Sequence, residues 1–556
     1  MNVKAEHPAK NGNGLIPNTV NIKRGVLGKV LGKKKTVEVP MQNVPHGLPK
    51  TVDSLCPECT TRIKATIYEE GGKIWMKKKC EKHGEFKDLV YSNAELYEKI
   101  GKWTFEDAPG LNKWVISNPE CNLNCGLCNN HLSVGCQITI DLTNRCNLNC
   151  PICFANANKT GKVYELTKEQ INTTLANLDK IDPKPSVVMW AGGEPTIHPD
   201  FLYACKEAKR RGIGYILVAT NGIAIANSLD FAKKAKEAGA DCLYLQFDGI
   251  GDKYYIGTRG KPLWDTKLKA IENCRKSGLK VVLVPTVVKN INGDQVGPIL
   301  EFAVKNCDVV VGISYQPVSI TGRIKYEERM KMRETISDIC DDIESHTHGL
   351  LKTMRDWYPL AMASPISKLL AKLYGQFILR PSCHSDCGLG TYLLIGPDGK
   401  ATPATKFIDF EGFMTELNEY QKNVKPGMKF KAISTLKAFQ LMRKYYKKEE
   451  APNGMSFIRF LKVLDNMVGP KADTVPYAER EWKMLLIMSM QFQDGYNFNF
   501  DRIRRCNIHY STPDGKMYPF CTYNSGPCYR ERVESQFSMP MAEWKKAMAK
   551  KLKNKN

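Results

Sequence analysis

The sequence lacks any long apolar segment and any surplus of acidic residues. No run of about 18 uninterrupted apolar residues occurs, so we expect no transmembrane helix and at most a peripheral membrane contact. The N-terminus, MNVKAEHPAKNGNG, has no apolar signal core. This favours a reducing, cytoplasmic location, with peripheral contact at the inner membrane surface as the alternative. Asp and Glu total 58 against 81 Lys and Arg, and the formal charge of +23 favours polyanionic partners: nucleic acid, an anionic membrane surface or a phosphorylated substrate.

The composition is that of a folded, metal-binding protein. A chain of 556 residues, 42% hydrophobic and 25% charged, excludes disorder for most of its length. Twenty cysteines in a reducing compartment indicate metal binding rather than disulfides. Five cysteines stand alone in helix or strand patterns and are predicted to be buried small side chains: Cys205, Cys242, Cys274, Cys307 and Cys340.

The stretch 141–157, DLTNRCNLNCPICFANA, places three cysteines in the spacing C-x3-C-x2-C. These are Cys146, Cys150 and Cys153, and they follow a strand-like segment at 137–142. Three thiolates can hold three irons of a 4Fe-4S cluster and leave the fourth iron open for a ligand. A zinc knuckle is the alternative, but it needs further ligands at matching spacing.

After this loop, strand-like and helix-like segments alternate regularly. The strands are predicted at 137–142, 187–190, 215–220, 242–247, 281–288 and 309–317. This rhythm predicts an α/β fold of six parallel βα units. Because chemistry in such folds gathers where parallel strands end, the three cysteines are well placed for it.

The loop resembles that of the radical S-adenosylmethionine (SAM) enzymes, and the segment Gly192-Gly193-Glu194-Pro195 after the second strand resembles their GGEP motif. The resemblance implies a partial (β/α)6 TIM barrel. It implies that the open iron binds the amino and carboxyl groups of SAM and that one electron releases a 5′-deoxyadenosyl radical. Gly192, Gly193 and Glu194 would hold the amino group of SAM.

Other strand ends carry further expected SAM contacts. In the family, the positions of Asn221 and Asp248 lie near the ribose, and those of Ser314 and Gln316 lie near the adenine. Asn-Gly and Asp-Gly pairs also make ordinary loops, so each of these residues is a weak signal by itself.

Three more groups of cysteines are predicted to bind metal. Cys56, Cys59, Cys80 and His83 flank a hairpin and would form a rubredoxin-like site for one iron or one zinc. Cys121, Cys125, Cys128 and Cys136 would close an auxiliary 4Fe-4S cluster, and Cys387, Cys506, Cys521 and Cys528 a second, with Cys383 as an alternative ligand. Zinc is the alternative occupant of both. The C-terminal group lies beside two PDGK turns and resembles the cluster-binding extensions of radical SAM enzymes.

We therefore expect five parts along the chain. They are a flexible basic leader (1–48), a rubredoxin-like metal domain (49–105), an auxiliary-cluster segment (106–136), the radical SAM core (137–325) and a helical C-terminal domain for substrate and cluster (326–556).

This order of motifs resembles the archaeal tetraether lipid synthases. The resemblance implies coupling of the terminal methyl carbons of two phytanyl chains of a diether phospholipid. The partners would be that lipid, an anionic membrane surface and a low-potential electron donor such as ferredoxin, with no nucleic acid. The apolar segment 357–379 and the positive charge fit this hypothesis.

Two alternatives remain. A radical methylase of a pterin precursor would have a small polar pocket, and its two cysteine triads would be two SAM sites. Cys136 argues against a second SAM site, because it adds a fourth thiol to the first triad. An iron-sulfur electron carrier or a zinc-rich nucleic-acid-binding protein would explain the cysteines and the charge. Neither non-enzyme hypothesis explains the GGEP segment or the six βα units.

Overall fold

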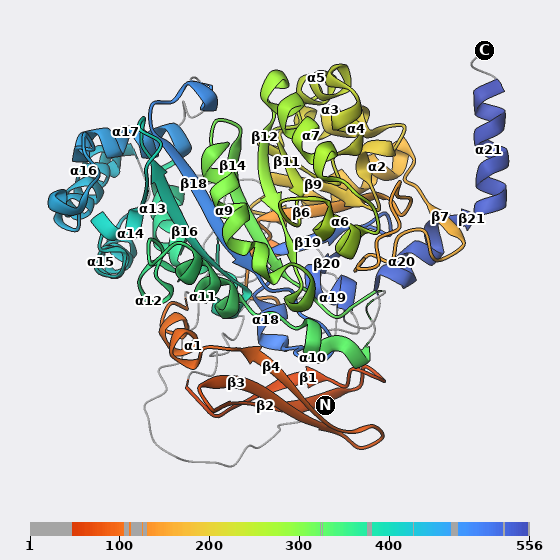
Figure 1. Ribbon diagram of the computed structural model, residues 1–556, viewed down its shortest axis with the longest axis horizontal. Helices are drawn as coiled ribbons and strands as arrows, with labels where there is room; N and C mark the ends of the chain where they lie inside the picture. Colours follow the sequence, from red (N-terminus) through yellow and green to blue (C-terminus); the bar gives the residue numbers. More distant parts are fainter. Residues whose placement is uncertain are drawn as a thin grey trace, which may run out of the picture. The chain divides into compact units, whose positions relative to one another are not determined.

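The computed structural model describes residues 47–104, 111–112, 125, 130–322, 324, 326–374, 381–425, 428–468, 476–525 and 529–553 (Figure 1). All of them belong to one compact unit, Pro45–Asn556. None of the helices among these residues is long and apolar enough to cross a membrane.

The N-terminal part forms an antiparallel sheet of its own. Its strands, in spatial order, are β1 (Lys50–Leu55), β2 (Arg62–Glu70), β3 (Lys73–Cys80) and β4 (Gly84–Tyr91). Gly71 and Gly72 make the predicted turn between β2 and β3, and both have positive φ, which favours glycine. Helix α1 (Ala94–Gly101) follows. Alternate apolar side chains such as Ile67, Ile74 and Met76 are buried.

A parallel sheet carries the predicted βα units. Its strands lie side by side in the order β6 (Gln137–Thr143), β9 (Val187–Gly192), β10 (Tyr215–Thr220), β11 (Cys242–Gln246), β12 (Lys280–Val284) and β14 (Val310–Pro317). The connections between them contain, among others, the helices α2 (Lys168–Ala176), α3 (Phe201–Arg210), α5 (Leu229–Glu237), α7 (Trp264–Ser277) and α9 (Val296–Lys305). The α/β fold with six βα units is confirmed (Figure 1).

The fifth strand differs from its prediction. The segment 281–288 is not one strand, because β12 ends before Pro285 and the short β13 (Thr286–Val287) follows it. Proline has no backbone N–H, so it interrupts a ladder between central strands.

The C-terminal third adds strands to both edges of this sheet. Strand β18 (Lys483–Met490) runs parallel to β14, and β16 (Gly388–Ile395) pairs antiparallel with β18. At the other edge, β19 (Ile508–Ser511) runs parallel to β6 and pairs with β20 (Met517–Pro519). We expected mainly helices here, and KMLLIMSM of β18 was missed because a short continuous apolar run has no period that separates strand from helix.

The same region also contains helices such as α11 (Ile336–His346), α13 (Ser364–Tyr374), α15 (Phe410–Asn423), α16 (Met428–Lys444) and α17 (Phe457–Val468). Helices α13, α15 and α16 form a satellite core, whereas α11 packs in the main core and α17 in another small cluster. Leu369 and Leu373 of α13 pack with Phe413 and Leu417 of α15 and Leu441 of α16. The described part of the apolar segment 357–379 therefore packs inside the protein.

Buried charges join the N-terminal sheet to the rest of the unit. The Arg333 guanidinium contacts Asp494 at 2.6 Å and Asp88 of β4 at 3.2 Å, and all three side chains are at most 2% exposed. Arg329 also contacts Asp88, at 2.9 Å. Nearby, the Lys78 ammonium of β3 donates to the Gly495 carbonyl at 2.6 Å.

Candidate functional site

The cysteine loop begins at the end of β6, as predicted. Cys146, Cys150 and Cys153 are half-buried and not paired in disulfides. Burial raises the pKa of the Cys146 thiol to about 12, while the backbone N–H of Leu148, 3.4 Å from its sulfur, partly opposes this. Three thiols on one loop, with a donor aimed at one sulfur, fit the donor set of a cluster with three protein ligands.

Two asparagines and an ion pair fix the shape of this loop. Asn158, in the left-handed region with φ 66°, accepts from the Cys146 N–H at 3.0 Å and donates to the Leu148 carbonyl at 3.0 Å. Asn144 accepts from the backbone N–H of Tyr164 at 3.0 Å. Arg145 donates from Nε to Glu165 at 2.8 Å. The cysteines are thus presented on a backbone that is tied to its surroundings at several points.

The GGEP segment lies directly against the cysteine loop. The Gly193 N–H donates to the Thr143 carbonyl at 2.6 Å, and the Glu194 N–H donates to the Arg145 carbonyl at 2.9 Å. A Cβ on Gly192 would lie 2.2 Å from the Thr143 oxygen, and one on Gly193 would lie 2.1 Å from the Arg145 oxygen. Only glycine permits this approach of the two backbones.

Glu194 is buried, and internal donors satisfy its carboxylate. One oxygen accepts from the hydroxyls of Thr196 at 2.5 Å and Thr220 at 2.7 Å. The other accepts from the Asn221 N–H at 2.8 Å. Burial raises the pKa of Glu194, and these donors partly oppose the increase. Its predicted contact with the amino group of SAM stays a prediction.

Asn221 connects the GGEP segment to the loop, and a buried lysine supports it. The Asn221 amide donates to the Asn147 side chain at 2.6 Å. Lys267 of α7 donates to the Asn221 carbonyl at 2.6 Å and to Gln246 Oε1 at 2.8 Å. Burial lowers the pKa of Lys267 to about 7. The motifs did not single out this lysine, although it lies at helical spacing with the buried Ala270, Ile271 and Cys274.

Asp248 is fully buried at the end of β11 and binds an arginine. Arg259, from helix α6 (Asp252–Arg259), donates to both carboxylate oxygens, at 2.6 and 2.8 Å. Although burial favours the neutral acid, the Arg259 charge and the Thr286 N–H keep the pKa of Asp248 below its usual range. Arg259 also lies beside the Cys150 thiol. Nothing in the sequence around Arg259 pointed to it.

Ser314 and Gln316 of β14 converge on Tyr244 of β11. The Tyr244 hydroxyl donates to Ser314 Oγ at 2.5 Å and accepts from the Gln316 amide at 3.0 Å. Ser314 is fully buried, whereas Gln316 and Tyr244 are partly exposed. Adenine contacts by Ser314 and Gln316 stay a prediction, and Tyr244 was not foreseen.

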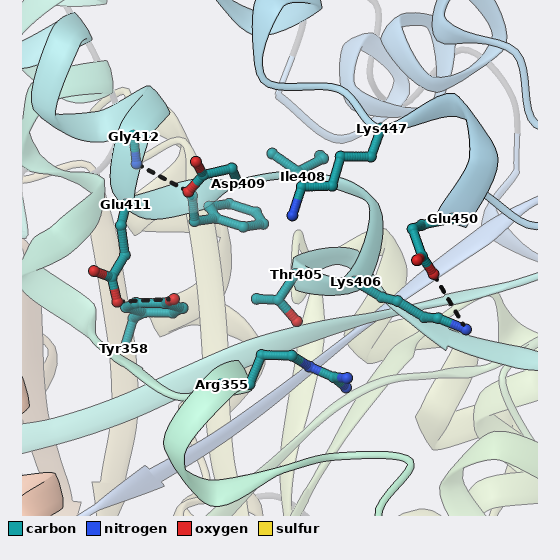
Figure 2. A pocket seen from close by; sticks show the side chains of 11 residues that line it. Arg355, Tyr358, Thr405, Lys406, Ile408, Asp409, Glu411, Gly412, Lys447 and Glu450 are labelled. Atoms are coloured by element: carbon teal, nitrogen blue, oxygen red, sulfur yellow. Dashed lines mark hydrogen bonds and ion pairs between the residues drawn. The ribbon is translucent and has the colours of Figure 1, made fainter.

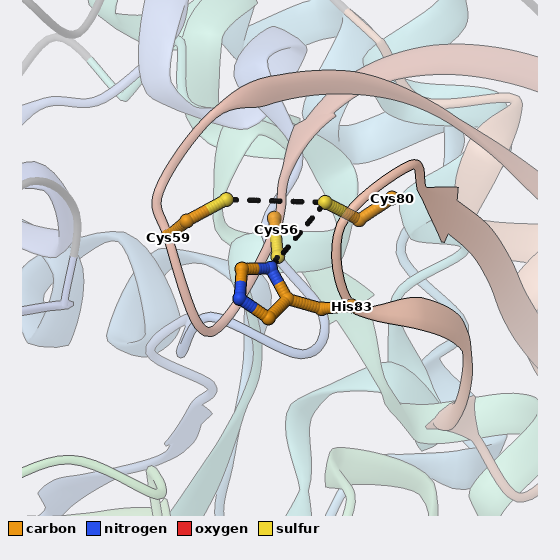
Figure 3. Close-up of side chains that lie close together, drawn as sticks. All are labelled: Cys56, Cys59, Cys80 and His83. Atoms are coloured by element: carbon orange, nitrogen blue, oxygen red, sulfur yellow. Dashed lines mark hydrogen bonds between the residues drawn. The ribbon is translucent and has the colours of Figure 1, made fainter.

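Cys56, Cys59, Cys80 and His83 come together as predicted (Figure 3). Their ligand atoms all lie within 4.8 Å of one another. The sulfurs of Cys59 and Cys80 are 3.8 Å apart, and His83 Nδ1 is 3.6 Å from the Cys56 sulfur and 3.5 Å from the Cys80 sulfur. A tetrahedral site with metal–sulfur bonds of about 2.3 Å needs sulfurs about 3.8 Å apart, so the geometry fits one metal ion.

The charges at this site also suit a metal ion. The Thr61 hydroxyl and N–H lower the pKa of the Cys59 thiol to about 6. The hydrogen bond from His83 lowers the pKa of Cys80. Both thiols are thereby brought closer to the thiolate form that a metal requires.

Several C-terminal cysteines gather with Cys136 around Asn507. The Asn507 carbonyl accepts from the Cys136 N–H at 2.8 Å, and the Asn507 side chain accepts from the Ser382 N–H at 2.9 Å. Burial raises the pKa of Cys383, and the neighbouring thiols of Cys387, Cys136 and Cys506 raise it further. Cys136 thus lies beside the C-terminal group, although it was predicted to act with the preceding triad.

Of the remaining predicted cluster ligands, Cys521 lies near Cys387 and Cys506, Cys125 lies among tyrosines, and three lie outside the described residues. Cys521 is buried, and its sulfur accepts from the Gln493 N–H at 3.4 Å. Its pKa is raised by burial and, to a smaller extent, by Cys387. Cys125 is buried among tyrosines, where its N–H donates to the Tyr529 hydroxyl at 3.2 Å. Cys121, Cys128 and Cys528 lie outside the described residues. The isolated Cys205, Cys242, Cys274 and Cys340 are buried, and Cys307 is half-buried.

A pocket of about 710 Å³ opens in the C-terminal third (Figure 2). It is lined by residues such as Arg355, Lys406 and Lys447 together with Asp409 and Glu450. Lys406 and Glu450 form an ion pair at 3.7 Å across it. None of the predicted site residues lines this pocket.

Comparison with known proteins identifies two regions of the chain. Residues 140–303 match the radical SAM superfamily, and residues 48–92 match the HMPTM N-terminal zinc ribbon domain. A 7,8-dihydro-6-hydroxymethylpterin dimethyltransferase from Methanocaldococcus jannaschii is 43% identical over 498 residues, which are 89% of this chain and 96% of the relative. An Fe-coproporphyrin III synthase from Methanosarcina barkeri is 33% identical over 27% of this chain and 36% of the relative. Streptococcus suis SuiB, solved with S-adenosylmethionine, has a TM-score of 0.32 and 20% identity over 39% of this chain and 48% of its own.

The radical SAM prediction is confirmed, together with SAM, a 4Fe-4S cluster and a mononuclear metal as cofactors and a need for a reductant. The predicted coupling of phytanyl chains is wrong, because the relative that matches nearly the whole chain is a pterin dimethyltransferase. Neither of the two features that favoured a lipid substrate requires one. The apolar helix α13 packs into a core, and positive charge suits many anions.

The motifs at the strand ends, the mononuclear metal site and the match over nearly the whole chain indicate the same family. This chain belongs to the radical SAM superfamily and, within it, to the family of the Methanocaldococcus jannaschii 7,8-dihydro-6-hydroxymethylpterin dimethyltransferase.

Proposed function

We propose that this protein is a radical SAM methyltransferase that acts on a dihydropterin such as 7,8-dihydro-6-hydroxymethylpterin. The observation that carries the proposal is the 43% identity to the pterin dimethyltransferase over 89% of this chain. This was the alternative hypothesis from the sequence, and it replaces lipid coupling.

Cys146, Cys150 and Cys153 are the proposed ligands of the SAM-binding cluster, and Gly192, Gly193 and Glu194 the proposed support for SAM. When bound, the cluster and SAM supply the 5′-deoxyadenosyl radical that activates a C–H bond. The residues of the chain orient the cofactor. The glycines bring the GGEP backbone onto the loop, and Asn221 links the Glu194 carboxylate to the Asn147 side chain.

One face of the parallel sheet carries a mixture of polar and apolar side chains that would suit a planar substrate with polar edges. The opposite face, with residues such as Ile216, Leu243 and Leu283, is buried under the helices. The alternating residues remain half-exposed: Leu217, Ala219, Tyr244, Gln246, Val282, Gln316, Leu486, Met488 and Met490. Amide and phenol groups can hydrogen-bond the edge of a pterin, while aliphatic and thioether groups pack on its rings.

Auxiliary 4Fe-4S clusters are proposed at the two other cysteine groups. Cys121, Cys125 and Cys128 form the first group. Cys387, Cys506 and Cys521 form the second, with Cys383 or Cys528 as its fourth ligand. Because Cys136 lies beside Cys383, it is a further candidate for this second group. Iron content of the Cys136→Ser and Cys383→Ser proteins, each compared with Cys205→Ser, would assign these ligands.

An anaerobic assay tests the proposed activity. The protein is incubated with SAM, dithionite and 7,8-dihydro-6-hydroxymethylpterin, and the products are analysed by mass spectrometry. We expect 5′-deoxyadenosine and a pterin heavier by one or two methylene units, and methyl-labelled SAM reports the origin of the methyl group. Cys150→Ala should abolish both products, whereas Cys307→Ala should not. If 5′-deoxyadenosine forms while the pterin stays unchanged, the proposed substrate is wrong.

A further inference from the structure

The end of helix α6 lies directly on the cysteine loop. Gly260, which ends the helix in the left-handed region with φ +75°, packs against Pro151, whose Cδ would be 3.6 Å from a Cβ at that position. Tyr255 of the same helix forms an apolar cluster with Leu148 and Leu263, and Cys146 and Cys150 pack against this cluster. The helix therefore shields the loop from water and sets the distance between its last residue and the thiols.

The last residue of that helix, Arg259, is held in one orientation. Its Nε and Nη2 donate to the two oxygens of Asp248 at 2.6 and 2.8 Å, and Nη2 also donates to Thr286 Oγ1 at 3.0 Å. Asp248 is itself fixed, since it accepts from Thr258 Oγ1 at 2.9 Å and from the Thr286 N–H at 3.1 Å. Such a bidentate pair restricts the planar guanidinium far more than a single contact would.

Arg259 also acts on the cysteine loop, where the adjacent Gly260 packs against Pro151. Burial raises the pKa of the Cys150 thiol, and the Arg259 guanidinium opposes this increase through its charge and a hydrogen bond. Asp248 is 0% exposed and the Arg259 side chain 11% exposed, so water competes little for this donor. An N–H···S hydrogen bond to a cluster thiolate stabilises the more negative, reduced state more than the oxidised state, which raises the reduction potential.

We propose that Arg259 is a positioning residue for the SAM-binding cluster: it donates a hydrogen bond to the Cys150 thiolate and raises the reduction potential of the cluster, while Asp248 fixes its guanidinium. The proposal rests on Cys150 being a cluster ligand, but not on the identity of the substrate. Asp248 then acts on the cofactor site through Arg259, because its two carboxylate oxygens already accept internal hydrogen bonds.

Redox titration of the anaerobic holoenzyme tests the proposal without any pterin present. Electron paramagnetic resonance follows the reduced cluster whose signal changes on addition of SAM, which separates it from auxiliary clusters. At the wild-type midpoint potential, Arg259→Met should lower the ratio of reduced to oxidised cluster about tenfold, equal to about 59 mV for one electron. Arg259→Lys, which keeps the charge but not the fork, should fall between the two.

Matched controls keep the test decisive. Arg275→Met removes another carboxylate-bound arginine, on helix α7, and should leave the potential unchanged. Thr286→Val removes one hydrogen bond that holds the guanidinium without changing any charge, so it should move the potential in the same direction as Arg259→Lys. If the Arg259→Met protein loses its iron, Arg259→Lys and Thr286→Val decide the question. Wild-type potentials in the variants that retain full iron would overturn the proposal, whatever the pterin assay gives.

Discussion

Replacing Arg333 by methionine should weaken the attachment of the N-terminal sheet to the rest of the unit, so that local opening there becomes more frequent. Arg333 is buried and pairs with Asp494 at 2.6 Å and Asp88 at 3.2 Å. Breaking a buried pair by removing one partner costs about 3–5 kcal/mol, because a charge is left buried without compensation. Arg329 still pairs with Asp88, so we expect the lower end of that range. A loss of about 3 kcal/mol corresponds to about a hundredfold faster exchange of amides that exchange through local opening.

Hydrogen exchange of the holoenzyme measures this effect in strands β3 and β4. Arg275→Met is the matched control, since its pairs with Glu272 and Asp308 are one third or more exposed and should contribute about 1 kcal/mol or less. In an Asp494→Asn background, Arg333→Met should cost less, because the two residues interact directly. Equal exchange in the Arg333→Met and Arg275→Met proteins would refute the reasoning.

Three further predictions follow from the site. Cys59→Ser should remove one equivalent of bound metal and speed amide exchange in β1–β4, while SAM cleavage continues. Metal analysis and hydrogen exchange measure these effects, and an unchanged metal content would contradict the predicted site. Gly193→Ala would bring a Cβ to 2.1 Å from the Arg145 oxygen, so it should weaken SAM binding, measured by equilibrium dialysis, by well over tenfold. A Cβ on Gly101 meets nothing within 4 Å, so the Gly101→Ala protein should bind SAM normally. Lys267 has a pKa of about 7 in the folded protein against 10.5 ordinarily, so between these pH values the unfolded state binds more protons than the folded state. The difference in unfolding free energy between wild type and Lys267→Met should therefore rise with pH from about 7 to 10.5. A difference that does not change with pH would contradict the buried position.

Much of the fold could be predicted because its signals are local. Short, mainly apolar runs in β10 and β11, repeated with helix-like segments between them, indicate parallel strands whose ends meet at one edge of the sheet. The mononuclear metal site could also be predicted, because its ligands are close in sequence and one hairpin brings them together: Cys56, Cys59, Cys80 and His83.

The rest depends on contacts between distant segments. Arg259 ends an ordinary charged helix, and its importance comes from Asp248 and Cys150, which lie on other elements. Cys136 comes near Cys383 where Asn507 accepts hydrogen bonds from the N–H groups of Cys136 and of Ser382, which precedes Cys383. Spacing along the chain carries no information about such encounters. The substrate is a still clearer case, since several clusters and positive charge suit a lipid as well as a pterin.

The pairing of β19 with β6 ties the order of synthesis to the order of assembly. Ile508, His509 and Tyr510 lie beside Gln137, Ile138 and Thr139, so the strand that leads into the cysteine loop gains its outer neighbour only from the last tenth of the chain. A ribosome-bound nascent protein therefore exposes that strand's unpaired backbone until Ile508–Ser511 has been synthesised. Because this pairing joins segments that are far apart in the sequence, we expect it to form slowly during folding.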